Sequence, residues 1–213
     1  MRHIMVMNSK GGCGKSTLAT NIAAYFAREG ERVTLADFDP HSTSLDWLGV
    51  RRADVPSIVG IPAWRDGLRS VPRDTEILVI DSPARVHGSE LTDIVRRAET
   101  ILVPVLPSTI DIFACSKFME ELSANGRIAR HQARIAVVAN RVRENTLIFE
   151  QLEQYLRKLG VPYLASLRDA QNYVRAFTRG LSVFELPEYL AWPEWQQWEP
   201  ICEWLDSKRS RPH

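Results

Sequence analysis

The chain has 213 residues, 45% of them hydrophobic and 25% charged, with a formal net charge of +1. This length suits one α/β domain, and the near-neutral charge excludes binding to nucleic acid or membranes through overall charge alone. No apolar run reaches the ~18–20 residues of a transmembrane helix, and Cys13, Cys115 and Cys202 show neither metal-binding nor disulfide spacing. We expect a single cytoplasmic domain over 1–213, without a signal peptide or membrane contact, ending in a short basic tail over 208–213.

Short β-branched apolar runs alternate with longer amphipathic stretches along the chain. The apolar runs predict strands at 3–8, 32–38, 76–81, 100–105, 134–140 and 161–166. The amphipathic stretches predict helices at 15–29, 88–98, 110–125, 144–159 and 193–206, and the irregular stretch 51–75 predicts one short strand and one helix. Such alternation is typical of a doubly wound, mostly parallel sheet flanked by helices. Pro104 predicts that its strand lies at an edge of the sheet or carries a bulge.

A glycine-rich segment, GGCGKST, lies between the first predicted strand and the first predicted helix. In this context it predicts a phosphate-binding loop, because the glycines let backbone N–H groups face phosphate oxygens and the helix N-terminus attracts anions. Lys15 is expected to reach the β- and γ-phosphates, and the Ser16 hydroxyl to join the Mg²⁺ shell. The sequence therefore predicts a nucleoside triphosphate site formed by Gly11, Gly12, Cys13, Gly14, Lys15, Ser16 and Thr17.

Carboxylates follow two of the predicted strands. Asp37 and Asp39 come at the end of the second strand, and Asp81 ends the strand at 76–81. Ligands of open α/β sheets bind at the carboxyl ends of the strands. Asp81 is therefore a candidate to hold Mg²⁺ through a water, and Asp39 to orient or polarise the attacking water. The alternative for either residue is an aspartate that caps a helix from a loop.

Four segments of this chain together resemble the ParA/MinD family of P-loop ATPases, whose deviant Walker A loop reads KGGxGK[ST]. The segments are KGGCGKST (10–17), DFDPHSTSLDW (37–47), VPVLPSTIDIFA (103–114) and NYVRAFTRGLSVFE (172–185). The resemblance runs from residue 1 to about 186. It is greatest to the small, ParF-like ParA proteins of plasmid partition. It implies a P-loop fold and ATP with Mg²⁺ as ligands.

The resemblance also implies that ATP assembles a sandwich homodimer and that hydrolysis separates it. Lys10 would reach across this dimer to the partner's phosphates, and it would be catalytic together with Lys15 and Asp39. The alternative interpretation of Lys10 is a solvated lysine of the loop without such a role. Pro107, Ser108 and Asp111 would face the dimer partner. Asn140, at a strand end, would hydrogen-bond adenine and favour ATP over GTP, or would instead cap the next helix.

Proteins of the ParA branch bind DNA non-specifically when ATP is bound, and the resemblance assigns this contact to Arg168, Arg175 and Arg179. The segment 181–207 departs from the family because it has no Lys or Arg and several acidic residues. Four of its members, Trp195, Trp198, Cys202 and Leu205, fall at helical spacing, which favours a last helix packed on the sheet. An acidic helix is poorly suited to a membrane surface.

The resemblance predicts a nucleoid-associated ATPase that segregates or positions cargo while a ParB-like or other adaptor protein stimulates hydrolysis. The cargo would be plasmid or chromosomal DNA, or a protein assembly such as a carboxysome or a chemotaxis cluster. The alternative is a metabolic P-loop enzyme, such as a dethiobiotin-synthetase-like ligase or a small-molecule kinase, with 51–75 as a substrate-binding insert. A nitrogenase-type reductase is disfavoured because it needs paired cysteines for an iron–sulfur cluster.

Overall fold

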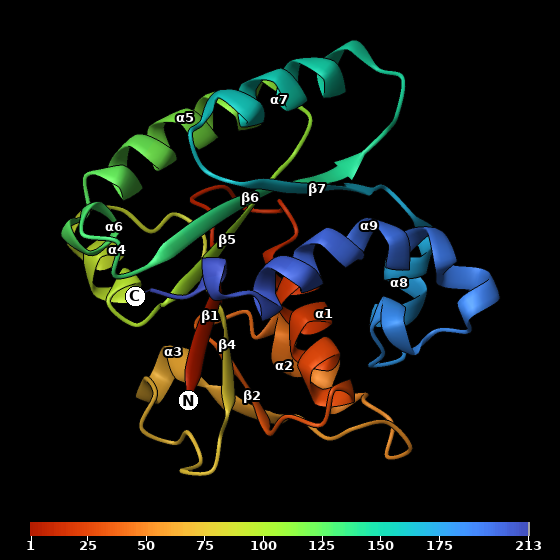
Figure 1. The fold of residues 1–213 in the computed structure, drawn as a ribbon. Helices are drawn as coiled ribbons and strands as arrows, with labels where there is room; N and C mark the ends of the chain where they lie inside the picture. The colour runs from red at the N-terminus through yellow and green to blue at the C-terminus, as the bar shows by residue number, and fades with distance from the viewer. Residues whose placement is uncertain (213) are drawn as a thin grey trace.

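A seven-stranded parallel sheet with helices on both faces forms the centre of the computed structural model, which describes residues 1–212 (Figure 1). Its strand order is β3-β2-β4-β1-β5-β6-β7. The strands are β1 (Arg2–Val6), β2 (Val33–Asp37), β3 (Val59–Pro62), β4 (Ile77–Asp81), β5 (Thr100–Val105), β6 (Arg134–Val142) and β7 (Tyr163–Arg168). All six predicted strands are confirmed, and β3 is the short strand predicted within 51–75.

Nine α-helices connect the described strands or follow them. They are α1 (Lys15–Arg28), α2 (Thr43–Gly49), α3 (Ala63–Asp66), α4 (Gly88–Val95), α5 (Thr109–Ser123), α6 (Gly126–Ala129), α7 (Leu147–Lys158), α8 (Gln171–Phe177) and α9 (Glu188–Asp206). The sequence did not predict α2, α6 and α8, since four to seven residues are too few for a clear amphipathic period. It placed the start of α9 at Pro193, but the helix begins five residues earlier, directly after Pro187.

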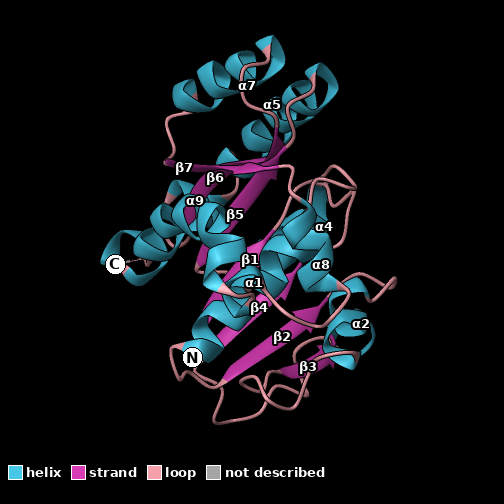
Figure 2. Cartoon of the chain, turned by 90° about the vertical axis from the view of Figure 1, so that its right-hand side faces the viewer, coloured by secondary structure: helices cyan, strands magenta, loops and turns pink. Residues whose placement is uncertain are grey.

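Helices lie on both faces of the sheet (Figure 2). A hydrophobic core of buried side chains lies on each face. Buried side chains of α4, α5 and α7 pack against one face, and those of α1 and α9 pack against the other. The side chains of β5 show why both faces are apolar, because Ile101 and Val103 enter the first core while Leu102 enters the second. The continuous apolar runs of the sequence are thus strands covered on both sides, as predicted.

The prediction that Pro104 marks an edge strand or a bulge is wrong. β5 lies between β1 and β6, and Pro104 pairs in regular register with Val138. Proline is tolerated there because β1 ends at Val6, so the missing N–H faces a position that no strand occupies. The side chain of Asn8 fills this position and donates a hydrogen bond to the Pro104 carbonyl, at 2.7 Å.

The C-terminal segment packs on the sheet through aromatic side chains and one serine. Trp198 and Leu205 are fully buried, as the helical spacing predicted, and Trp195 is half-buried. The stretch 208–213 was predicted as a basic tail. Ser210 within it is buried and accepts a hydrogen bond from the Arg2 guanidinium, at 2.7 Å, while residue 213 lies outside the described part of the chain. The described part of this stretch therefore belongs to the fold.

Candidate functional site

The loop between β1 and α1 lines a cleft of about 620 Å³ at the carboxyl end of the sheet. The predicted residues that line it are Gly11, Gly12, Gly14, Lys15, Ser16, Thr17, Asp39, Asn140 and Arg168. His41 and Thr43 lie beside Asp39, and residues of the β7–α8 region form another part of the lining. The cleft therefore brings together residues from five segments that are far apart in the sequence.

Gly14 begins α1 in a backbone conformation that favours glycine. Its φ is +96°, and a Cβ placed on it would lie 2.1 Å from Nδ2 of Asn140. That Nδ2 donates a hydrogen bond to the carbonyl of Cys13 at 2.8 Å. Asn140 thus supports the phosphate-binding loop directly. Sequence reasoning assigned it only to adenine or to a helix cap.

The two lysines of the loop occupy different positions. Lys15 is 7% exposed, lines the cleft, and donates from Nζ to the carbonyl of Lys10 at 3.2 Å. Lys10 is half-buried and is not among the residues that line the cleft. Cys13, between them, points into the protein, and burial raises the pKa of its thiol to about 11. Lys15 therefore lines the cleft, and Lys10 lies outside its lining.

Two aspartates face each other at the ends of neighbouring strands, because Asp37 of β2 pairs with Asp81 of β4. Asp37 accepts hydrogen bonds from the Ser44 backbone N–H and hydroxyl, at 3.0 and 2.7 Å. Asp81 is 1% exposed, and neither of its carboxylate oxygens has a hydrogen-bond partner among the described residues. Burial, with a smaller contribution from the charge of Asp37, raises the pKa of Asp81 to about 7.

A buried carboxylate without partners is costly unless a cation or a donor satisfies it. Ser16, predicted to bind the metal, lies near enough to Asp81 to lower its pKa, although its hydroxyl makes no hydrogen bond to the carboxylate in this structure. Carboxylate and hydroxyl oxygens are the ligands that Mg²⁺ prefers, usually together with waters and substrate phosphates. The residues present at the end of β4 therefore fit Mg²⁺.

Asp39 lies on the loop that links β2 to α2. Its backbone N–H donates to Asp37 at 2.9 Å, and its Oδ1 accepts from the backbone N–H of His41 at 3.0 Å. Its carboxylate lines the cleft and is partly exposed. Buried Asp37 thus holds the loop in place, so that Asp39 can contact a water in the cleft.

Of the remaining predicted residues, only Arg168 lines the cleft. Ser108 caps α5 by accepting a hydrogen bond from the backbone N–H of Asp111 at 3.0 Å, and Pro107 precedes it. Arg175 and Arg179 are exposed on and after α8. The guanidinium of Arg168 is paired with Glu194 of α9, at 2.5 Å. Sequence reasoning did not identify this ion pair.

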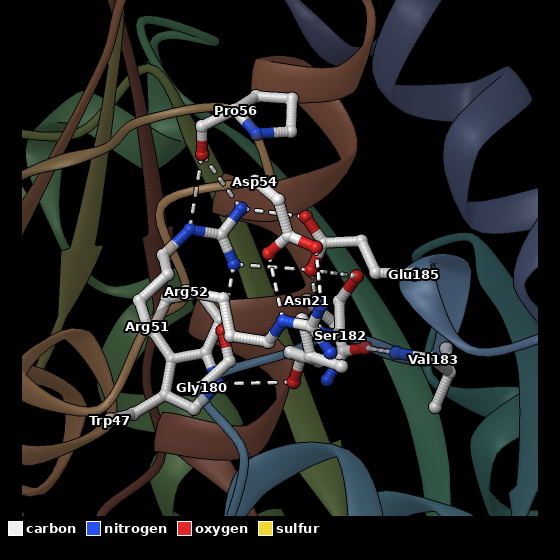
Figure 3. A network of polar contacts seen from close by, with 11 residues as sticks. Asn21, Trp47, Arg51, Arg52, Asp54, Pro56, Gly180, Ser182, Val183 and Glu185 are labelled. Carbon is white, nitrogen blue, oxygen red and sulfur yellow. Dashed lines mark hydrogen bonds and ion pairs between the residues drawn. The ribbon is translucent and has the colours of Figure 1, made fainter.

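A second group of residues missed by sequence reasoning fixes α2 to the rest of the chain (Figure 3). We call it the α2 clamp; it consists of Trp47, Arg51, Gly180, Ser182 and Glu185. Arg51 and Glu185 form an ion pair at 2.6 Å, with side chains only 6% and 4% exposed. Arg51 also donates to the Gly180 carbonyl at 2.9 Å, and its guanidinium lies 4.9 Å from the centre of the Trp47 ring.

The α2 clamp explains the residues GLSVFE (180–185), which end the fourth segment that resembles the ParA/MinD family. Gly180 has a φ of +64°, and a Cβ on it would lie 2.3 Å from the Arg51 Cα, so only glycine fits. Glu185 accepts hydrogen bonds from the Ser182 backbone N–H and hydroxyl, at 2.8 and 3.0 Å, while it pairs with Arg51. The S-x-x-E spacing is a recognisable capping box. Because Arg51 precedes Gly180 by 129 residues, the sequence contains no local signal for the ion pair.

Replacement of Glu185 by glutamine is expected to destabilise the protein by about 1–3 kcal/mol, because Arg51 stays buried without a charged partner. Urea unfolding monitored by circular dichroism would measure the loss. The matched control is Glu188→Gln, since Glu188 is exposed. Equal unfolding free energies of the two variants would contradict a stabilising role for the α2 clamp.

Comparison with known proteins agrees with this site. The family model described as the CobQ/CobB/MinD/ParA nucleotide binding domain matches residues 4–183. Maintenance of carboxysome distribution protein A from Halothiobacillus neapolitanus is 31% identical over 189 residues, which cover 86% of this chain and 87% of that protein. The solved structure of apo McdA from Cyanothece has a TM-score of 0.78 at 17% identity, with 96% and 99% of the two chains covered. The ATP complex of a single-residue variant of Cyanothece McdA has a TM-score of 0.71 at 15% identity, covering 95% and 96%.

Proposed function

Because the chain belongs to the CobQ/CobB/MinD/ParA nucleotide-binding family and is a P-loop ATPase, we propose that it positions cargo by cycling between an ATP-bound dimer and a released form. In this proposal ATP binds in the cleft, with its phosphates on the loop 11–17. Lys15 contacts the β- and γ-phosphates, and Ser16 and Asp81 hold Mg²⁺, which neutralises phosphate charge when bound. Asn140, beside the loop, is proposed to contact adenine.

The position of Lys10 is the observation that supports the proposed dimer. Its neighbour Gly11 lines the cleft, but Lys10 does not, and Lys15 already occupies the phosphate end of that cleft. A second cation that lies outside its own cleft is available to a partner's nucleotide, where negative charge builds up during hydrolysis. We propose that Lys10 acts across the dimer.

The surface next to Ser108 supports the same contact. Ile110 and Phe113, on the first turns of α5, are 69% and 67% exposed. Large apolar side chains exposed together are typical of protein interfaces. We therefore propose that Pro107, Ser108 and Asp111 belong to the dimer interface.

The name of one relative and two exposed arginines bear on the cargo and on the surface along which it is positioned. The relative from Halothiobacillus neapolitanus is named for the maintenance of carboxysome distribution, which favours a protein assembly over a plasmid as cargo. Arg175 and Arg179 are exposed and suit non-specific contact with DNA phosphates on the nucleoid, whereas Arg168 is largely occupied by Glu194. An adaptor protein would link cargo and stimulate hydrolysis. Among the described residues, no helix combines the length and apolarity needed to cross a bilayer.

No observation favours the metabolic alternative. That alternative would use 51–75 as a substrate-binding insert, but none of the residues that line the cleft comes from that stretch. It forms β3 and the four-residue α3 at one edge of the sheet.

Replacement of Lys10 by alanine is expected to weaken ATP-dependent dimerisation and DNA binding at least about tenfold, because one charge contact to each nucleotide is lost. Light scattering and binding to nonspecific duplex DNA would be measured with ATP–Mg²⁺, ADP–Mg²⁺ and no nucleotide, over a range of salt concentrations. Binding of the wild type should need ATP and weaken with salt.

The matched control is Lys158→Ala, which removes an exposed lysine at the end of α7. Nucleotide affinity of the Lys10→Ala monomer should stay unchanged, since Lys15 remains. If the wild type binds DNA in none of the nucleotide states, positioning on DNA is contradicted. If the Lys10→Ala protein dimerises with ATP as well as the wild type does, the proposed contact of Lys10 across the dimer is contradicted.

A further inference from the structure

We propose that Glu194 of α9 is a positioning residue for the wall of the cleft that faces the nucleotide base. The inference rests on the proposed binding of ATP in this cleft. It gives a role to the acidic, tryptophan-rich segment 181–207. That segment contains no Lys or Arg, in contrast to the basic segment that the family resemblance leads one to expect after residue 185.

Glu194 is a carboxylate in the protein interior with three charged or polar contacts. It is 0% exposed. Its Oε1 accepts hydrogen bonds from Nε and Nη2 of Arg168, at 2.6 and 2.5 Å, and its Oε2 accepts from Nδ2 of Asn172 at 2.9 Å. Both oxygens are therefore occupied, and each binds a different end of one short segment, 168–172. A fully buried charge loses its hydration, which destabilises the folded protein unless contacts such as these compensate for the loss.

The segment between these two contacts forms part of the cleft. Arg168, Asp169 and Ala170 line it, and Tyr173 follows them on α8. Two more contacts from α9 fix the same segment: Gln197 accepts from the backbone N–H of Arg168 at 3.0 Å, and Trp198 donates to the Tyr173 hydroxyl at 3.0 Å. α9 thus holds this wall at several points while it lies outside the cleft itself.

The wall differs from the phosphate-binding loop in chemistry. Tyr173 and Phe177 contribute aromatic surface to it, which suits a planar base, whereas the loop contributes backbone N–H groups that suit phosphates. A change in the wall should therefore affect the part of the affinity that comes from the nucleoside. Binding through the phosphates should not change.

Replacement of Glu194 by glutamine tests this separation. Glutamine keeps the size and one acceptor but cannot pair with the Arg168 cation. The variant should fold, because the Arg168 side chain is 39% exposed and can turn toward water. We expect the affinity for ATP–Mg²⁺ to fall about tenfold, because the segment 168–172 is no longer held by the Glu194 carboxylate in the position that suits the base. The affinity for tripolyphosphate–Mg²⁺, which has no base, should not change. In steady-state hydrolysis KM should rise while kcat stays the same.

Glu199→Gln is the matched control, since Glu199 is exposed on the same helix. Calorimetric titration of the wild type, this control and Glu194→Gln with both ligands decides between the outcomes. Equal ATP affinity in all three proteins overturns the inference, as does a parallel loss for ATP and tripolyphosphate. A wild type that binds neither ligand overturns the proposed function instead. If Glu194→Gln does not fold, Arg168→Lys should show the same selective loss for ATP, because lysine lacks the planar fork of arginine.

Discussion

Replacement of Asp39 by alanine is expected to lower the rate of ATP hydrolysis about 10²–10⁴-fold while ATP binding persists. The reason is its position: the carboxylate lines the cleft on a loop that Asp37 holds, but it is not part of the phosphate-binding loop. Loss of Asp39 removes the group that orients the attacking water and leaves Lys15 and Ser16 in place. Single-turnover hydrolysis and ATP affinity, measured on the same protein, separate the two effects.

Asp46→Ala provides the control for the Asp39 variant, since Asp46 is exposed on α2 and does not line the cleft. In the proposed cycle, Asp39→Ala should also remain dimeric and DNA-bound in ATP, because the step that separates the dimer is blocked. Hydrolysis at the wild-type rate would show that another group orients the water.

Replacement of Asp81 by asparagine is expected to abolish hydrolysis and yet to stabilise the nucleotide-free protein at pH 8, by roughly 1–4 kcal/mol. The folded protein raises the pKa of Asp81 from 3.8 to about 7. Between these values the folded state retains a proton that the unfolded chain has released, so stability falls as the pH rises from about 4 to about 7. Asparagine cannot ionise and avoids this loss.

Urea unfolding of wild type and Asp81→Asn at pH 5 and pH 8 checks the prediction. The stability difference between the two proteins should be larger at pH 8, and Asp46→Asn, at an exposed position, should show no such pH dependence. ATP–Mg²⁺ should stabilise the wild type far more than Asp81→Asn, because the metal then satisfies the carboxylate. A difference that does not change with pH would mean that Asp81 remains charged in the folded protein.

The elements and the nucleotide loop could be predicted from the sequence because their signals are local. Apolar runs define the strands, and GGCGKST carries its own turn geometry between a strand and a helix. The edge position predicted from Pro104 was wrong because the gap that accommodates the proline depends on where β1, a different segment, ends. The ion pair of Arg51 with Glu185 joins residues 134 positions apart, and that of Arg168 with Glu194 joins residues 26 positions apart. No pattern of spacing in the sequence predicts such pairs.

The contact between Arg2 and Ser210 joins the first strand to the segment after the last helix, at the end of the sheet away from the cleft. The Thr100 hydroxyl donates to the Ser210 carbonyl at 2.6 Å and extends this contact to β5. Opening of α9 would therefore disturb β1, which leads directly into the phosphate-binding loop. The amide hydrogens of α9 and β1 should therefore exchange with solvent as one cooperative unit. A nucleotide held by the loop would then slow hydrogen exchange in a helix that it does not touch.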